Sequence, residues 1–134
     1  MHITRINPDG LHQTPGYHHV TVVESGRTAY LAGQCPVAPD GSIPPADDLP
    51  AQLELTISNC LTVLACVGAR PEDVVRSVIY VVTDDQHELS SVWAALNDSA
   101  LGPAFSSAST LLGVAQLGFP GQRLEVDLTA ALAT

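Results

Sequence analysis

The sequence predicts an α+β domain in which a single sheet carries two helices on one face. Three observations lead to this prediction. The first two are that short β-branched runs lie towards both ends of the chain and that two segments between them repeat apolar residues at helical spacing. The third is the length of 134 residues, which suits one domain. We therefore assign residues 1–134 to a single unit.

The N-terminal part of the chain predicts a β-hairpin. Residues 20–24 and 27–32 are β-favouring runs, and Ser25 and Gly26 between them suit a tight turn. The Pro- and Gly-rich residues 36–50 that follow are expected to form a long loop.

A first helix is predicted after this loop. Asp47 and Asp48 can each cap its N-terminus, and Pro50 suits its first turn. Gly68, with Pro71 just beyond, is expected to end it. Apolar residues at intervals of three and four form one helix face, which comprises Leu53, Ile57, Leu61, Leu64 and Val67.

Residues 74–83 predict a strand that is apolar on both faces. One face comprises Val74, Val78 and Val82, and the other Val75, Ile79 and Val81. A half-exposed strand would alternate apolar and polar residues. Because two helices can cover only one side of a sheet, we expect another subunit to cover the second side.

The C-terminal half predicts a second helix and two further strands. The helix spans residues 87–100, and the strands span 110–117 and 123–132. The helix has apolar residues at helical spacing, which are Leu89, Val92, Trp93 and Leu96. In the last strand Leu124, Val126, Leu128 and Ala130 alternate with Arg123, Glu125, Asp127 and Thr129. One face of this strand is therefore apolar and the other polar.

The charge of the chain excludes several functions. It has 14 acidic and 5 basic residues, a net charge of -9, and no Lys. Without Lys the chain can form neither a Schiff base nor a Walker A phosphate loop. The excess of carboxylates disfavours nucleic acid and anionic membranes as partners.

Targeting and metal-binding signals are also missing from the pattern. No signal peptide or apolar run of about 20 residues is recognisable, which predicts a cytoplasmic protein. The three Cys residues form no C-x-x-C spacing, which predicts free thiols. His2, His12 and His87 are scattered, and the adjacent His18 and His19 would point in different directions on a strand, so we expect no metal site.

Three side chains are candidates for chemistry, each with a structural alternative. Glu125 lies on the polar face of the last strand and becomes a candidate proton-transfer group if a subunit covers that face; otherwise it belongs to a solvated face with a local ion pair. Tyr17 follows a Pro-Gly turn and suits either a pocket wall or simple packing. Cys35 has no neighbouring His or helix N-terminus in sequence, which favours an inert buried thiol.

Four segments of the chain occur together in one known family. They are Ala32-Gly33-Gln34-Cys35-Pro36, residues 52–68 with Asn59, Asp73-Val74-Val75, and Leu124-Glu125-Val126. In order and spacing they resemble the Rid (reactive intermediate deaminase) family, also called YjgF, over nearly the whole chain. The resemblance implies a chorismate-mutase-like fold, a homotrimer with inward-packed sheets, and small-molecule pockets at the subunit interfaces. It also implies hydrolysis of reactive enamines and imines without a metal or organic cofactor.

The resemblance assigns roles to individual residues. Tyr17 matches the family's pocket tyrosine, Gly33 the glycine of its Ser-Gly-Gln motif, and Glu125 the residue that positions the hydrolytic water. Ala32 replaces the serine of that motif. Backbone N–H groups near Gly33 and Leu111 are expected to hold a developing oxyanion.

One family position is changed in a way that affects the ligand. The family's carboxylate-binding Arg is replaced by Ser109 or, in a second alignment, by Phe105, and Trp93 replaces an Asn. We expect these three residues, with Gly33, Thr110 and Leu111, to contact the ligand. Because a guanidinium grips a carboxylate with two hydrogen bonds, a pocket without it should prefer a neutral or more apolar molecule.

The sequence therefore predicts a divergent Rid-family homotrimer that binds a small metabolite at its interfaces. If it is catalytic, we expect hydrolysis or tautomerisation of an imine or enamine, with Glu125 as the base and Tyr17 as pocket wall or proton donor. The first alternative is a non-catalytic trimer that binds a small ligand or a partner. The second is an auxiliary biosynthetic enzyme that acts on a bulkier apolar intermediate.

Overall fold

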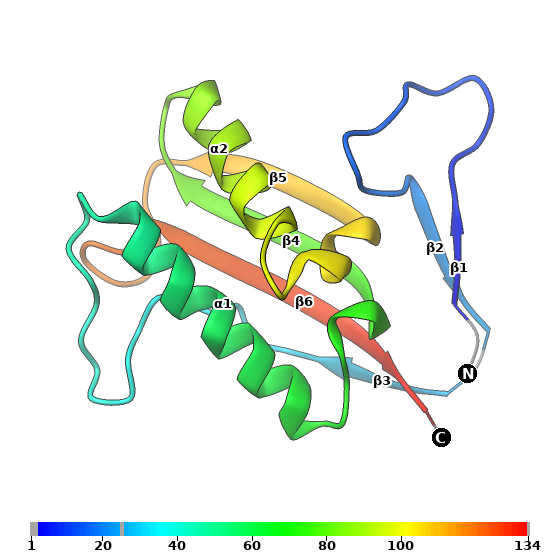
Figure 1. Ribbon diagram of the computed structural model, residues 1–134, viewed down its shortest axis with the longest axis horizontal. Coiled ribbons are helices and arrows are strands. Elements are labelled where there is room, and N and C mark those ends of the chain that lie inside the picture. The colour runs from blue at the N-terminus through cyan, green and yellow to red at the C-terminus, as the bar shows by residue number, and fades with distance from the viewer. Residues whose placement is uncertain (1–2, 25, 134) are drawn as a thin grey trace.

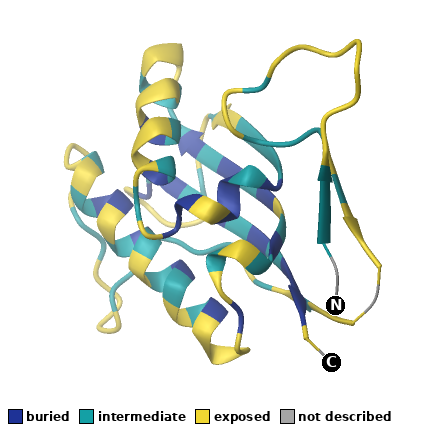
Figure 2. Cartoon of the chain, turned by 45° about the vertical axis from the view of Figure 1, so that its right-hand side comes forward, coloured by how far each residue is buried: buried dark blue, intermediate teal, exposed yellow. Residues whose placement is uncertain are grey.

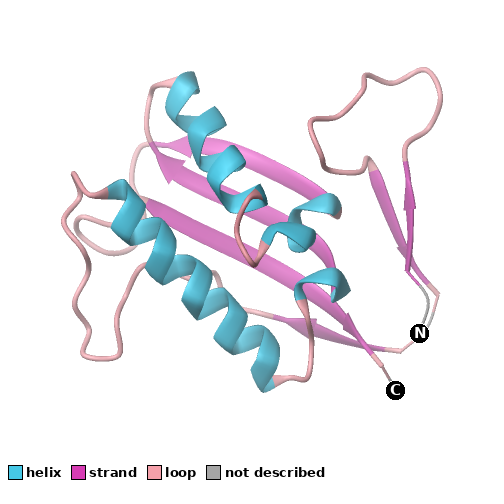
Figure 3. Ribbon diagram, viewed as in Figure 1, coloured by secondary structure: helices cyan, strands magenta, loops and turns pink. Residues whose placement is uncertain are grey.

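The predicted α+β architecture is confirmed by a computed structural model that describes residues 3–24 and 26–133. Two helices lie across the same face of a four-stranded sheet (Figures 1 and 3). The sheet order is β3 (Arg27–Tyr30), β6 (Leu124–Leu132), β4 (Val74–Val82) and β5 (Ala108–Val114), and the helices are α1 (Leu49–Cys66) and α2 (Gln86–Asn97). Only β4 and β5 are parallel to each other; the other neighbours are antiparallel. Short 3-10 helices, η1 (Pro71–Asp73) and η2 (Gly102–Ser106), precede β4 and β5.

The predicted N-terminal hairpin is wrong. The strand β2 (Val20–Val23) pairs with β1 (Ile3–Ile6), a strand the sequence pattern did not indicate, and β3 pairs with β6. The β1–β2 pair stands beside the main sheet, and its residues are half-buried or exposed (Figures 1 and 2). Gly26 has φ +111°, so the chain turns there, but it turns from one sheet into the other. Ser25 lies outside the described residues.

The helix α1 begins and ends where its sequence predicts. The side chain of Asp48 accepts a hydrogen bond from the Ala51 N–H at 3.1 Å, and Gly68 takes a positive φ of 73° after the last turn. The helix has a mean hydropathy of 1.2 and is long and apolar enough to span a membrane by composition alone. Here it packs on the sheet and buries Leu53, Cys60 and Leu64, as a core helix does.

The core lies between the helices and the sheet. On β6 the predicted alternation is confirmed, with Leu124, Val126, Leu128 and Ala130 all buried. A β-bulge between Val74 and Arg76 corrects the predicted faces of β4, because it puts Val74 on the buried face with Ile79 and Val81. We call the other side of the sheet, away from α1 and α2, the open face. It carries half-buried Val78 and Val82 and exposed large side chains, Tyr30 and Leu112.

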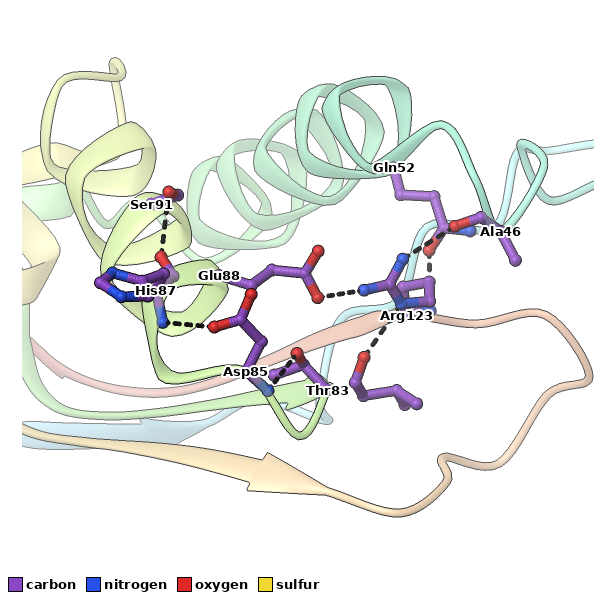
Figure 4. A network of polar contacts seen from close by, with 9 residues as sticks. Ala46, Gln52, Thr83, Asp85, His87, Glu88, Ser91 and Arg123 are labelled. Atoms are coloured by element: carbon purple, nitrogen blue, oxygen red, sulfur yellow. Dashed lines mark hydrogen bonds and ion pairs between the residues drawn. The ribbon is translucent and has the colours of Figure 1, made fainter.

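Arg123 connects the elements at one end of the sheet (Figure 4). Its guanidinium donates to the carbonyl oxygens of Val82 at 3.0 Å and Ala46 at 2.9 Å and pairs with the Glu88 carboxylate on α2. Its backbone N–H donates to the buried Gln52 side chain of α1 at 2.8 Å. Arg123 therefore lies just before β6. Its ion pair is with Glu88 of α2, and not with a carboxylate on the polar face of the last strand.

Candidate functional site

A cavity of about 320 Å³ lies between α2, β5 and the N-terminal loop. Its wall is formed by Pro15, Tyr17, Ser90, Trp93, Ser109 and Leu111. None of these described residues carries a charge. We call this space the Tyr17 cavity. The structure thus brings four of the predicted site residues together, from three separate parts of the chain.

Aromatic contacts hold the wall of the Tyr17 cavity in place. The Trp93 indole N–H donates to the Pro15 carbonyl oxygen at 3.0 Å, which ties the N-terminal loop to α2. The rings of Tyr17 and Trp93 meet edge to face at 6.2 Å, and Phe105 packs behind Trp93 at 6.0 Å. Phe105 is fully buried, so its side chain supports the wall and does not line the cavity.

Glu125 forms a second group, with Gly33, Cys35 and Gln122. Its Oε1 accepts hydrogen bonds from the Cys35 thiol at 3.3 Å and from the Gln122 amide at 3.2 Å. Its Oε2 lies so close to Gly33 that a Cβ there would stand 2.2 Å away. Among the described residues no hydrogen bond to Oε2 is formed, so this oxygen remains available for a ligand or water.

Cys35 is held in its thiol form. Burial raises its pKa to about 11, and the hydrogen bond and negative charge of Glu125 act in the same direction. Burial also raises the pKa of Cys60, on α1, to about 12. A protonated thiol is a poor nucleophile. Cys35 therefore acts as a hydrogen-bond donor and Cys60 as a packing residue, and Cys35 is half-buried where the sequence led us to expect a buried thiol.

The two groups lie on opposite faces of the sheet. Residues directly opposite each other across neighbouring strands share a face. Leu111 lies opposite Ile79, which is buried beneath the helices, whereas Glu125 lies opposite Tyr80 on the open face. The Tyr17 cavity and Glu125 cannot form one site within a single chain.

Thr110 belongs to the open face, next to Ser109 in sequence but on the other side of the pleat. Its hydroxyl accepts a hydrogen bond from the Arg76 guanidinium at 3.1 Å. Ser109 bonds instead to the Ser77 hydroxyl, beneath the helices. Thr110 therefore does not line the Tyr17 cavity.

Two polar residues of these groups did not emerge as site residues from the sequence: His12 and Gln122. The Tyr17 hydroxyl is 2.8 Å from the His12 Nε2 atom. Gln122 is buried, and its Oε1 also accepts the Phe119 N–H, so it links the β5–β6 loop to Glu125. For Gln122, the available sequence signal was a polar residue that follows a turn and lies three positions before Glu125. Within the described residues, no three His, Cys, Asp or Glu side chains are grouped as a metal site.

Comparison with known proteins identifies the family. Residues 11–132 match the family described as Endoribonuclease L-PSP. The structure of YyfB from Yersinia pestis, a protein of the conserved Rid family with unknown function, is 31% identical, with a TM-score of 0.85; the match covers 98% of this chain and 100% of that one. The chain belongs to the Rid family. The resemblance of its four sequence segments to that family is thereby confirmed.

More distant solved structures share the fold. Rv2704 from Mycobacterium tuberculosis, of the YjgF/YER057c/UK114 family, is 23% identical with a TM-score of 0.59, covering 98% of this chain and 100% of that one. Escherichia coli TdcF, solved with bound serine, is 22% identical with a TM-score of 0.64, covering 95% and 94%. No curated protein matches the chain.

Proposed function

We propose that this Rid-family protein binds a small neutral metabolite and hydrolyses an imine or enamine, with Glu125 as the base. The observation that carries this proposal is the carboxylate of Glu125, which two donors hold through one oxygen while the other remains available. In the reaction, water attacks the C=N carbon as Glu125 takes its proton. The nitrogen receives a proton to give a carbinolamine. The hydroxyl of the carbinolamine then loses its proton to form the C=O bond, the nitrogen gains a second proton, the C–N bond breaks, and a carbonyl compound and ammonia form.

The separation of the two groups supports assembly of the site from two copies of the chain. We propose a homotrimer with the open faces packed inward, in which Glu125 of one copy meets the Tyr17 cavity of the next. The open face supports this because it exposes 84% of Tyr30 and 40% of Leu112. Exposed apolar surface of this kind is typical of an interface.

The lining of the Tyr17 cavity supports a neutral ligand. TdcF binds serine, which is charged at both its ends, whereas the described lining here is uncharged. Ser109 in place of a guanidinium removes charge-assisted hydrogen bonds of about 1.5–3 kcal/mol each to a carboxylate. Ordinary 2-imino acids are therefore poor substrates in this proposal.

RNA is an unsuitable substrate for this chain, although the family's description names an endoribonuclease. The net charge is -9 and there is no Lys. A protein that holds a polyanion needs a basic surface to replace its counterions. We propose that a small molecule, and neither nucleic acid nor a membrane, is the partner, and that the protein acts in the cytoplasm.

The test is a panel of neutral and carboxylate-bearing imines, generated in situ and followed by ammonia release. We expect Glu125→Gln to lower hydrolysis of a neutral imine by at least about a hundredfold, as for loss of a general base. Asp127→Asn, which changes the next carboxylate on the same face of β6, is the matched control and should leave the rate unchanged. Equal rates for the wild type and Glu125→Gln would refute the role of Glu125. Light scattering during gel filtration should give three times the 14.0 kDa chain mass.

A non-catalytic binder is the second candidate, favoured by Ser109 and Ala32 at positions where the family carries Arg and Ser. Tight binding of a neutral metabolite by a protein that hydrolyses no imine would support it. The aromatic wall formed by Tyr17 and Trp93 also suits an auxiliary biosynthetic enzyme with a bulkier apolar substrate. Hydrolysis of only aryl-substituted imines would favour that version.

A further inference from the structure

The hydroxyl of Tyr17 has a titratable partner outside the Tyr17 cavity. The phenol lines the cavity, and its oxygen is 2.8 Å from Nε2 of His12. Tyr17 is half-buried, whereas His12 is exposed on the N-terminal loop. The pair therefore extends from the cavity to the solvent.

Neighbouring rings fix the imidazole of His12 in this position. The ring of His19 stands edge-on to it with centroids 4.8 Å apart, and His19 Nε2 contacts the His12 carbonyl oxygen at 3.1 Å. On the cavity side, Trp93 packs against Tyr17. These contacts define where the phenol and the imidazole meet, so the hydrogen bond is part of a built arrangement.

A phenol bonded to an imidazole can carry a proton in either direction. If Nε2 donates to the phenol oxygen, the phenol O–H is free to donate into the cavity. If the phenol donates to Nε2, its oxygen is free to accept a proton from the cavity. The exposed imidazole suits the solvent end, since its two ring nitrogens allow it to take a proton on one side and release one on the other.

We propose that His12 and Tyr17 form a proton shuttle that tautomerises neutral enamines, imines and ketones in the Tyr17 cavity. The proposal rests on the proposed binding of a neutral ligand there but uses neither Glu125 nor a second copy of the chain. It gives the cavity an activity of its own, besides hydrolysis. His12 acts through Tyr17 and is a positioning and relay residue.

With an enamine as substrate, the shuttle delivers one proton to carbon and is restored by water. Tyr17 gives its proton to the β-carbon, whose new C–H bond takes the electron pair of the C=C bond, and the nitrogen lone pair forms the C=N bond of an iminium ion. The His12 imidazolium returns a proton to the phenol oxygen and becomes neutral. It then recovers a proton from water, while the iminium loses its N–H proton to water.

The test is deuterium exchange at the α-carbon of phenylacetone, a neutral ketone, in D₂O, followed by proton NMR. The wild type should exchange faster than the same concentration of free imidazole. Tyr17→Phe should lower the rate by at least about tenfold because it removes the group that contacts the probe. His12→Asn should do so too, although the Asn amide can still donate to the phenol; it keeps a hydrogen bond but cannot transfer a proton.

Two controls separate the shuttle from folding and from the proposed hydrolysis. His87→Asn removes an exposed imidazole that does not line the cavity and should leave exchange unchanged. Asp127→Asn changes a carboxylate that does not line the cavity and should also leave exchange unchanged. Exchange no faster than free imidazole, or His12→Asn as fast as the wild type, would overturn the shuttle. Loss of exchange in Asp127→Asn would also overturn it, whereas hydrolysis insensitive to Glu125→Gln would refute only the proposed function.

Discussion

Gly33 is where a single methyl group should disturb the Glu125 carboxylate. In Gly33→Ala the new Cβ would lie 2.2 Å from Oε2, 2.7 Å from the carboxyl carbon and 3.0 Å from Cγ of Glu125. The side chain of Glu125 must move, and its hydrogen bonds from Cys35 and Gln122 are lost. At about 0.5–1.5 kcal/mol for each bond, we expect unfolding to become easier by about 1–3 kcal/mol.

The assay is a double-mutant cycle in urea and thermal unfolding. Glu125→Ala removes the obstacle, so Gly33→Ala in that background should be neutral or stabilise by about 0.4–1 kcal/mol through the unfolded chain. In the wild-type background Tm should fall by about 4–11 °C. Gly118→Ala, where a Cβ meets nothing within 4 Å, is the matched control. An equal loss of stability from Gly33→Ala in both backgrounds would show that the new methyl group does not act through the Glu125 carboxylate.

Three further changes test other parts of the structure. Arg123→Met should lower the free energy of unfolding by about 2–4 kcal/mol, measured in urea, because it leaves two carbonyl oxygens and a carboxylate without their donor. Asp48→Ala should lower it by about 1 kcal/mol through loss of the α1 cap, whereas Asp47→Ala should have little effect. Alkylation of Cys35 should be slow at pH 8 and accelerate towards pH 11, since its raised pKa keeps the thiol protonated; peptide mapping should find exposed Cys66 modified first.

Local signals predicted the helices and the last strand because the forces that form them act within a few residues. Asp48 and Gly68 mark the two ends of α1, and the hydrogen bonds there join residues only three to five positions apart in the sequence. The alternation in β6 reflects burial of one face of the strand, so each residue's side chain is apolar or polar according to the face on which it lies. Such patterns do not depend on which strand lies next in the sheet.

Pairing between distant strands was not predictable in the same way. β2 was expected to pair with β3, the next strand along the chain, but each pairs with a strand from elsewhere. The bulge at Val74 and Arg76 changes the face of one residue without any Gly or Pro to mark it. The two halves of the candidate site were named by resemblance, but only the register shows that they lie on opposite faces.

The position of Arg76 bears on the neutral ligand proposed for the Tyr17 cavity. Arg76 lies closest in register to the position where the family carries its carboxylate-binding Arg, and it contacts Thr110. The pleat nevertheless puts Arg76 on the open face, while Ser109 points beneath the helices. The guanidinium of Arg76, one strand away, therefore cannot take the place of an arginine at position 109, although Arg76 and Ser109 lie near each other.

We predict that the side chain at position 109 determines whether the Tyr17 cavity binds a neutral or a carboxylate-bearing ligand. Ser109→Arg places a guanidinium at the wall of the Tyr17 cavity, and we expect serine to bind at least about tenfold more tightly, measured by calorimetry, because its carboxylate gains charge-assisted hydrogen bonds. Thr110→Arg adds the same charge one residue away on the opposite face and should not improve binding. Thermal unfolding of both variants checks that the loss of the Ser109–Ser77 contact leaves the fold intact. Equal serine affinity in the two variants would show that net charge, and not the side of the sheet, sets the preference for neutral ligands.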